Sequence, residues 1–200
     1  RTEKVKRTTA ILLEETIEEL QQKRKAVEAQ NRELEIETSL EKVRTVAMGM
    51  KERADMLKIC TMIAKQLSVL GLKEIRNVQT AIFKVPMGTY MNYEFYAKHD
   101  KTFITETLYT NHKVALAFAK KMLKGKGAVA IAHMKGKQQV MDWLRYQKGT
   151  NVFIDTYLKT ATSLSYYWYS LGPVALGIST YQPLTKEELQ LFERFLKVFE

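Results

Sequence analysis

The sequence predicts an α+β fold. An antiparallel sheet should carry terminal helices on one face and a helical crossover on the other, behind an N-terminal coiled-coil helix. Apolar residues recur at alternating intervals of four and three in the first part of the chain, as in a coiled-coil seam. From residue 77 onward, short alternating or β-branched runs separated by turns indicate strands. Amphipathic helices flank these runs, and one face of the sheet is where both can bury their apolar stripes.

Residues 1–38 are predicted to form the coiled-coil helix. Glu, Gln, Lys and Arg, all good helix formers, flank its seam, and no Gly or Pro occurs before Gly49. A lone helix this polar is marginal in water, and an Asn in a core position often fixes the number of strands. We therefore expect a parallel homodimer through this helix. The seam residues are Leu13, Ile17, Leu20, Val27, Asn31 and Leu34.

The segment "SLEKVRTVAMGM" (residues 39–50) is expected to open a folded domain that extends over residues 39–200. A second seam begins at Ile36 and passes through Met50 and Ala54, displaced by two residues from the first. Such a phase change forces the coiled coil to overwind or underwind locally. The same pattern also fits a plain core helix that follows an imperfect coiled coil.

Between this entry helix and a closing helix, we expect five strands and a crossover of helical pieces. The closing helix, residues 185–200, starts with the capping-box pair Thr185 and Glu188. The apolar run 128–134 lies between the first two crossover helices. The expected strands are residues 77–85, 90–99, 102–110, 163–170 and 173–181, and the expected crossover helices are residues 113–125, 136–147 and 152–161.

A sheet covered by irregular helices tends to leave a concave ligand pocket. One side of the strands would supply its walls, and the crossover would supply its roof. Each aromatic residue in this set also fits a purely structural role, because aromatic residues dominate protein cores. The pocket candidates are Tyr93, Phe95, Thr107 and Tyr109 from the early strands, Trp143 and Phe153 from the crossover, and Tyr167 and Tyr169 from the last hairpin.

The net charge of +10 is unevenly distributed. Between Lys113 and Lys148 there are nine basic residues and a single acidic one, Asp142. Such a surface attracts phosphates, so a basic nucleic-acid-binding dimer is the alternative function. A solvated, Lys-rich face fits the same residues. The basic side chains are not interleaved with aromatic ones and no recognition helix stands out, which argues against nucleic-acid readout.

No catalytic motif occurs in the sequence, which has no GxGxxG loop, P-loop or HExxH pair. We therefore expect no enzymatic activity of this chain and no metal ligands, and the sequence implies no particular cofactor. His133 with Asp142 or Asp155 resembles a catalytic dyad, but no nucleophile accompanies it.

The single cysteine, Cys60, lies on an apolar helical stripe, excludes an internal disulfide framework and fits a reducing, cytoplasmic compartment. No apolar run approaches the ~18 residues of a membrane span.

Three stretches resemble a GAF domain of bacterial multidomain signalling proteins of the histidine-kinase type. "SLEKVRTVAMGM" resembles the "ALEKVR…AMxM" segment that opens such units, although Val46 stands where a second basic residue is usual. "KGKQQVMDWLRYQ" resembles their crossover helix, and "LGISTYQPLTKEELQLFERFLKVFE" resembles their closing strand and exit helix. All three stretches lie within residues 39–200.

The resemblance implies a regulatory, sensory input module of a dimeric signal-transduction protein. In such a module, a change induced by a small-molecule ligand or a partner is passed through coiled-coil helices, and residues 1–38 would be the signalling helix. The chain starts without Met and its last residues still follow a helical pattern. We therefore expect a downstream effector domain in the same, longer protein. No chromophore-attachment cysteine and no cyclic-nucleotide signature carries over.

Overall fold

The computed structural model describes residues 2–111 and 113–199. The chain divides into two compact units, Arg1–Ser39 and Leu40–Glu200. The first unit is helical, and its helix α1 is assigned to Thr2–Met48. The predicted seam residues are exposed in the single chain, from 46% for Ile17 to 61% for Leu20. This apolar stripe is therefore available to a partner.

The long helix does not continue into the next helix, α2 (Met56–Val69). It ends just before Gly49, and a 3-10 turn, η1 (Arg53–Asp55), lies between the two helices. The prediction of one helical seam through Met50 and Ala54 is therefore wrong. Glycine has a low helix propensity, which favours an end at this point.

The carboxylate of Asp55 fixes the corner between these helices. Its Oδ2 accepts hydrogen bonds from the backbone N–H of Lys51 at 2.8 Å and of Glu52 at 3.1 Å, and its Oδ1 accepts one from Lys58 Nζ at 2.6 Å. These bonds, with that of Lys58 foremost, hold the pKa of the Asp55 carboxyl well below its usual range. Because the carboxylate gives two backbone N–H groups a partner outside a helix, the local sequence favours a break.

The second unit is built on a six-stranded antiparallel sheet with the strand order β3-β2-β1-β6-β5-β4. The predicted α+β class and antiparallel sheet are confirmed. The expected number of five strands is too low, because the apolar run 128–134 forms the edge strand β4 beside β5. The strands are β1 (Ile75–Lys84), β2 (Thr89–Tyr96), β3 (Lys101–Leu108), β4 (Val129–Lys135), β5 (Ser163–Ser170) and β6 (Val174–Thr180).

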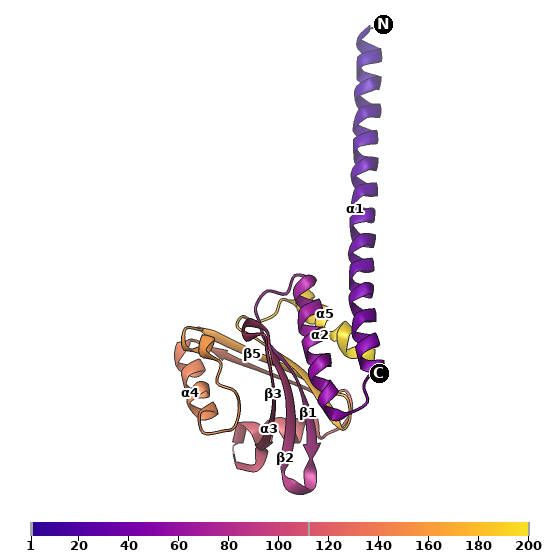
Figure 1. The fold of residues 1–200 in the computed structure, drawn as a ribbon. Helices are drawn as coiled ribbons and strands as arrows, with labels where there is room; N and C mark the ends of the chain where they lie inside the picture. The colour runs from indigo at the N-terminus through magenta and orange to yellow at the C-terminus, as the bar shows by residue number, and fades with distance from the viewer. Residues whose placement is uncertain (1, 112, 200) are drawn as a thin grey trace. The chain divides into compact units, whose positions relative to one another are not determined.

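Helix α2 and the closing helix α5 (Lys186–Leu196) lie on one face of the sheet (Figure 1). Cys60 of α2 is fully buried there, as predicted, and its Sγ lies 3.3 Å from the backbone oxygen of Tyr93 in β2. Phe192 of α5 packs edge-on against the ring of Tyr169 in β5, with the ring centroids 5.9 Å apart. Both helices bury their apolar stripes on this face.

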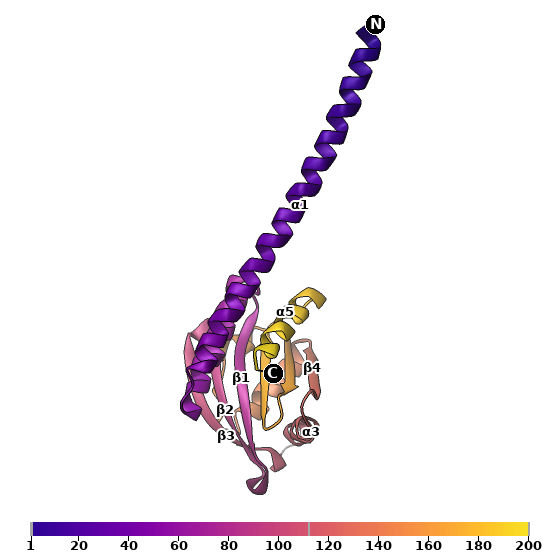
Figure 2. The same ribbon diagram turned by 90° about the vertical axis from the view of Figure 1, so that its right-hand side faces the viewer.

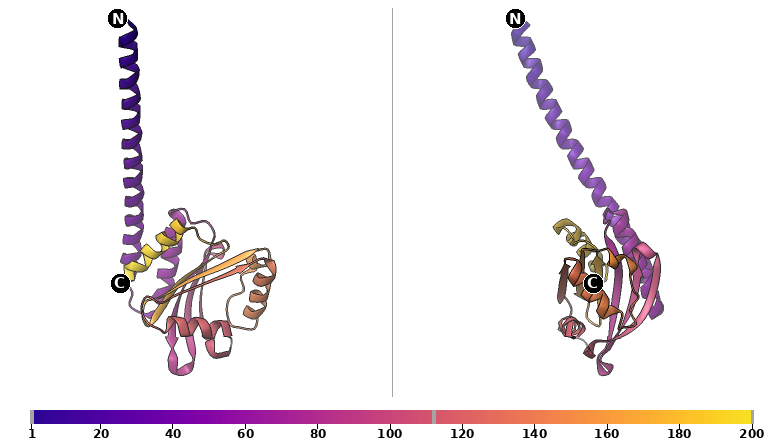
Figure 3. Two further views of the ribbon diagram at one scale, coloured as in Figure 1. Left: turned by 180° about the vertical axis from the view of Figure 1, so that it is seen from behind. Right: turned by 90° about the vertical axis from the view of Figure 1, so that its left-hand side faces the viewer.

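The crossover covers the opposite face of the sheet with α3 (Lys113–Met122) and α4 (Lys137–Gln147) (Figures 2 and 3). The helix predicted for residues 152–161 is wrong, because only a 3-10 turn forms there, η5 (Thr156–Lys159). Asp155 caps the start of this four-residue turn and pairs with Arg76 of the sheet.

The closing helix begins as predicted. Thr185 Oγ1 accepts a hydrogen bond from the N–H of Glu188 at 3.2 Å, and Glu188 Oε2 accepts one from the N–H of Thr185 at 2.8 Å. A 3-10 turn, η6 (Lys197–Phe199), follows α5, and the last predicted helical residue, Glu200, lies outside the described residues.

Among residues 2–111 and 113–199, no helix is both long and apolar enough to span a membrane.

Candidate functional site

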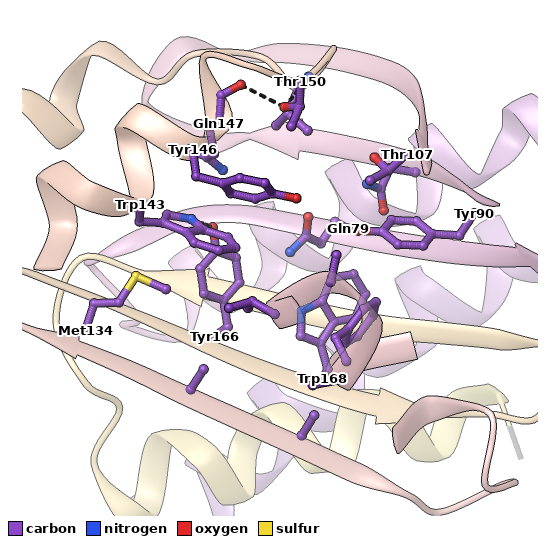
Figure 4. A pocket seen from close by; sticks show the side chains of 18 of the residues that line it. Gln79, Tyr90, Thr107, Met134, Trp143, Tyr146, Gln147, Thr150, Tyr166 and Trp168 are labelled. Carbon is purple, nitrogen blue, oxygen red and sulfur yellow. Dashed lines mark hydrogen bonds between the residues drawn. The ribbon is translucent and has the colours of Figure 1, made fainter. Parts of the chain in front are cut away.

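A cavity of about 480 Å³ lies between the sheet and the crossover (Figure 4). Strands β1, β2, β3, β4 and β5 contribute to its floor, while α3, α4 and the segment after α4 form its roof. This volume is typical of a pocket for a small organic ligand. The lining side chains are aromatic or aliphatic for the most part, with a cluster of polar groups on the floor.

Strand alternation decides which residues reach the cavity. Tyr90, Asn92 and Glu94 of β2 line it, as do Tyr166 and Trp168 of β5. Successive side chains of a strand point to opposite faces. The intervening residues of these two strands therefore face α2 and α5.

The predicted pocket residues divide into three groups. Thr107 and Trp143 line the cavity. The residues of the second group, from β2 and β5, lie on the helix-covered face, so their prediction as pocket residues is wrong. The prediction assigned the wrong one of the two alternating faces of each strand to the pocket. The third group lies near the cavity without lining it. The second group is Tyr93, Phe95, Tyr167 and Tyr169, and the third group is Tyr109 and Phe153.

Tyr109 and Phe153 support neighbouring rings instead. Tyr109 is 6% exposed and stacks on Tyr90, with ring centroids 6.2 Å apart and an interplanar angle of 8°. Phe153 stacks on Phe103 at 4.2 Å. Tyr109 therefore packs behind a wall residue of the cavity, and Phe153 belongs to a separate aromatic cluster.

Rings from four elements, α3, α4, β2 and β5, form the walls. Phe118 of α3 contacts Trp168, with ring centroids 4.7 Å apart, and Tyr90 at 5.7 Å. On the other side, Trp143 of α4 packs edge-on against Tyr166 at 5.8 Å, and its Nε1 donates a hydrogen bond to the Tyr166 hydroxyl at 2.9 Å. Both tryptophans of the chain therefore line this cavity.

The Trp168 ring lies directly against the backbone of the next strand. A Cβ atom added to Gly177 of β6 would lie 2.5 Å from Cδ2 of this ring. Residue 177 pairs with Trp168 across β5 and β6, so the missing side chain leaves space for the indole. Glycine is thus required here by close packing.

A buried ion pair lies at one end of the cavity floor. Arg76 Nε donates to Asp155 Oδ2 at 2.9 Å, and the two side chains are 1% and 0% exposed. Asp155 also lies 3.0 Å from His99 Nε2 and accepts a bond from the Tyr181 hydroxyl at 2.8 Å. Burial raises the pKa of Asp155, but the Arg76 charge and these hydrogen bonds outweigh it, so its pKa is lowered.

Glu94 of β2 is an acid on the cavity floor, and it is 2% exposed. It accepts hydrogen bonds from Asn77 Nδ2 at 3.1 Å and from the Tyr96 hydroxyl at 3.1 Å. Its pKa is raised, because burial outweighs the charge of Arg76 and these hydrogen bonds. Of these two acids, Asp155 therefore favours its charged form, and Glu94 favours its neutral form.

Three polar atoms of the lining residues have no hydrogen-bond partner among the described residues. They are Arg76 Nη2, Asn92 Oδ1 and Gln147 Oε1. Their side chains are buried, with 1%, 5% and 4% exposure. An unpaired buried polar group is unfavourable by about 1–3 kcal/mol. In a cavity, such groups indicate contacts that a ligand or ordered water completes.

The polar floor was not predicted from the sequence. The β1 sequence "IRNVQTAIFK" contains Arg76, Asn77 and Gln79, all of which are buried. Arg, Asn and Gln are seldom fully buried without a partner. Polar residues within an otherwise strand-forming run were therefore the available signal, whereas the prediction rested on aromatic residues of the strands.

The basic side chains of the crossover form no compact site. All nine between Lys113 and Lys148 are exposed, and they are distributed over α3, β4, α4 and the connecting segments. Lys113 and Lys121 lie at the edge of the cavity. Arg145 pairs with Asp142 at 2.9 Å on the surface of α4. Nucleic-acid binding by this region stays a prediction.

The His133 dyad considered from the sequence does not form. His133 Nδ1 lies 2.9 Å from Ser165 Oγ, whereas Asp142 and Asp155 bond to other residues. Among the described residues, no group of three or more His, Cys, Asp and Glu side chains is placed to hold a metal ion.

Comparisons of the chain with protein-family models, with curated proteins and with solved structures found no match.

Proposed function

We propose that this chain is a sensory input module of a dimeric signal-transduction protein. The cavity between the sheet and the crossover binds a small molecule, and the coiled-coil helices of two chains carry the resulting change to an effector domain in the same protein. The resemblance of three sequence stretches to GAF units of histidine-kinase-type proteins supports this assignment. The α+β architecture with an antiparallel sheet is compatible with it.

The observation that carries the proposal is the set of unpaired polar atoms inside an aromatic cavity. Pockets for small molecules combine apolar walls with a few converging polar groups. Here the walls contain both tryptophans, and the lining contains unpaired atoms of Arg76, Asn92 and Gln147. A purely structural core would be more stable with these groups paired or replaced by apolar ones.

The transmitting element in this proposal is the predicted coiled coil. A ligand shifts an equilibrium only if it binds two arrangements with different affinity. In this proposal, the α1 helices of two chains associate along the exposed seam of residues 13–34 and adopt two packing arrangements. Ligand binding would favour one of them.

Cross-linking between protomers tests the proposal before the ligand is identified. The native Cys60 is fully buried, and burial raises its thiol pKa to about 12, so it stays unreactive. In Leu34→Cys, the new thiol would then be the reactive one. The protein is unfolded, dialysed and refolded to remove bound compounds, and disulfide formation is followed with and without a protein-free metabolite extract. We expect an interchain disulfide whose rate of formation changes when the extract is added.

The matched control is Leu34→Cys combined with Asn92→Leu, which alters the cavity and leaves the helix intact. This double variant should form the disulfide at a rate that does not respond to the extract. Equal rates with and without extract in the Leu34→Cys protein would reject transmission through the helices, and the absence of an interchain disulfide would reject the parallel dimer.

A further inference from the structure

A chain of hydrogen bonds links Arg76 to Gln79, through Ser179 and Asn77. The Arg76 guanidinium has donors only, so Nη1 donates to Ser179 Oγ, at 3.3 Å. The Ser179 hydroxyl in turn donates to Asn77 Oδ1. This leaves Asn77 Nδ2 as a donor to Gln79 Oε1, at 3.2 Å. In this arrangement, Gln79 Oε1 is occupied as the acceptor for Asn77.

The Nε2 group of Gln79 is consequently the end that is left for the cavity. Gln79 lines the cavity, and in Figure 4 its amide lies amid the rings of Tyr90, Tyr146 and Trp168. Together with the unpaired Arg76 Nη2, it gives the floor two N–H donors. A ligand that pairs with them has to present a carbonyl-type oxygen.

The other unpaired lining atoms are acceptors. Asn92 Oδ1 lies on the floor strand β2, and Gln147 Oε1 lies at the end of the roof helix α4. Each belongs to a side chain that is at least 95% buried. A ligand that satisfies both kinds of unpaired atom needs an N–H donor as well as an oxygen acceptor.

The charge balance favours a neutral ligand. Asp155 already pairs with Arg76, a buried cation of the floor, at 2.9 Å. Glu94 is a second buried acid within the electrostatic reach of the same guanidinium. Because Asp155 already neutralises Arg76, a carboxylate on the ligand would be a buried anion without a cation of its own, which is unfavourable. The remaining cations of the lining, Lys113 and Lys121, are solvent-exposed.

We propose that the cavity recognises an uncharged, flat ring compound with a cyclic amide edge, whose carbonyl faces Arg76 and Gln79 and whose N–H faces an amide oxygen. The aromatic walls select the flat ring, since stacked and edge-on contacts favour planar partners. This inference rests on the proposed ligand-sensing function and specifies its ligand class.

Four probes of nearly equal size test the ligand class by calorimetric titration of the full chain. They are isoquinolone, which carries the cyclic amide, N-methylisoquinolone, which lacks the N–H, isoquinoline, which lacks both amide groups, and naphthoate, which is an anion. Isoquinolone should bind most tightly. The N-methyl compound and isoquinoline should each bind about tenfold more weakly, because each leaves buried polar atoms unpaired.

The variant Asn92→Leu tests the role of the acceptor Asn92 Oδ1, because it removes this atom and keeps a side chain of similar shape. It should weaken isoquinolone binding about tenfold and leave isoquinoline binding unchanged. It should also raise the melting temperature of the free protein, because it removes an unpaired buried atom. The matched control is Tyr93→Phe on the neighbouring, helix-covered position of β2, which should not alter either affinity. The four-probe comparison on the unaltered chain stands even if Asn92→Leu fails to fold.

Tighter binding of naphthoate than of isoquinolone would overturn the neutral cyclic amide, as would equal binding of isoquinolone and its N-methyl derivative. Failure of all four probes to bind at millimolar concentration would also overturn it. None of these results affects the cross-linking response to metabolite extract, so a wrong ligand class and a wrong function can be told apart.

Discussion

At the scale of single residues, the Arg76–Asp155 ion pair is the interaction beside the cavity whose disruption we expect to lower the stability of the fold most. Both side chains are almost completely buried. Removing one partner of such a pair leaves an uncompensated charge away from water. The pair joins β1 to the segment after α4, so it also holds part of the cavity roof against the sheet.

Asp155→Asn is expected to lower the free energy of unfolding by about 3 kcal/mol or more, because it leaves the buried Arg76 charge without its partner. Urea unfolding followed by circular dichroism measures the change. Asp142→Asn is the matched control. Its pair with Arg145 is exposed, with side chains 52% and 75% accessible, and such pairs contribute at most about 1 kcal/mol. A similar loss in both variants would contradict the role of the buried pair.

Glu94 makes the stability of the protein dependent on pH. Its pKa is raised in the folded state by burial, so folding favours the protonated form. Ionisation of Glu94 therefore lowers the stability of the folded state, and this loss is absent at pH values below the pKa that Glu94 has in the unfolded chain. It grows as the pH rises through that value and levels off above the pKa of the folded state.

Glu94→Gln removes this loss of stability and keeps a similar shape. Relative to the unaltered protein, the variant should gain free energy of unfolding as the pH rises from about 4, with a slope of at most about 1.4 kcal/mol per pH unit. Urea unfolding at a series of pH values measures this difference. A difference that is constant from pH 4 to pH 8 would show that Glu94 titrates as it does in the unfolded chain.

At the scale of elements, the alternation of each strand separates the cavity from the helix-covered core. Most strands could be predicted at the correct places, because β-branched and aromatic residues are concentrated in them. The face of β2 and β5 that lines the cavity was not predicted. Both faces of these strands are buried and both carry tyrosines, such as Tyr93 beside Glu94. In β2, the polar residues Asn92 and Glu94 mark the cavity face, whereas the prediction chose the aromatic residues Tyr93 and Phe95 of the opposite face.

The break between α1 and α2 and the edge strand β4 were not predicted, because the residue pattern is ambiguous at both places. The seam through Met50 and Ala54 keeps helical spacing, but the side chain of Asp55 binds two backbone N–H groups and ends the periodic structure. The β4 run is short, and periodicity alone does not distinguish a short apolar strand from a helical segment. Its pairing with β5 supplies the missing constraint.

The contact between β6 and the Trp168 wall gives a test at this scale. Gly177→Ala places a Cβ atom about 2.5 Å from the indole, so the ring has to move and the protein should lose about 1–3 kcal/mol of unfolding free energy. Tryptophan emission should change as well, because Trp168 is displaced. Gly149→Ala is the control, since a Cβ there would come no closer than 3.5 Å to a neighbouring group. Equal stability of the two variants would contradict the tight packing.

At the scale of the whole molecule, the fold was more predictable than the site. Local periodicity and capping indicate the elements, whereas the floor network joins residues far apart in the chain. Arg76 and Asp155 are separated by 79 positions, and Arg76 and Ser179 by 103. A single sequence does not encode such pairings in any local pattern, so the polar floor became visible only in the folded structure.

The predicted dimer is tested by one seam variant. Leu20→Lys should convert the protein to a monomer at micromolar concentration, because it places a charge in each copy of the coiled-coil core. Sedimentation equilibrium measures the mass. Leu12→Lys is the control, since Leu12 is also exposed, at 57%, but lies outside the seam. If the unaltered protein is a monomer, or if both variants dissociate equally, the predicted seam is wrong.

Both proposals depend on the aromatic cavity being a ligand site. Because Trp143 and Trp168 are the only tryptophans and both line it, tryptophan emission during titration with a library of small metabolites reports on its occupation directly. We predict at least one compound that changes the emission saturably with unit stoichiometry per chain, and that loses this effect in Asn92→Leu. An emission that no compound changes saturably, or a saturable change that Asn92→Leu leaves intact, would contradict a ligand site in this cavity.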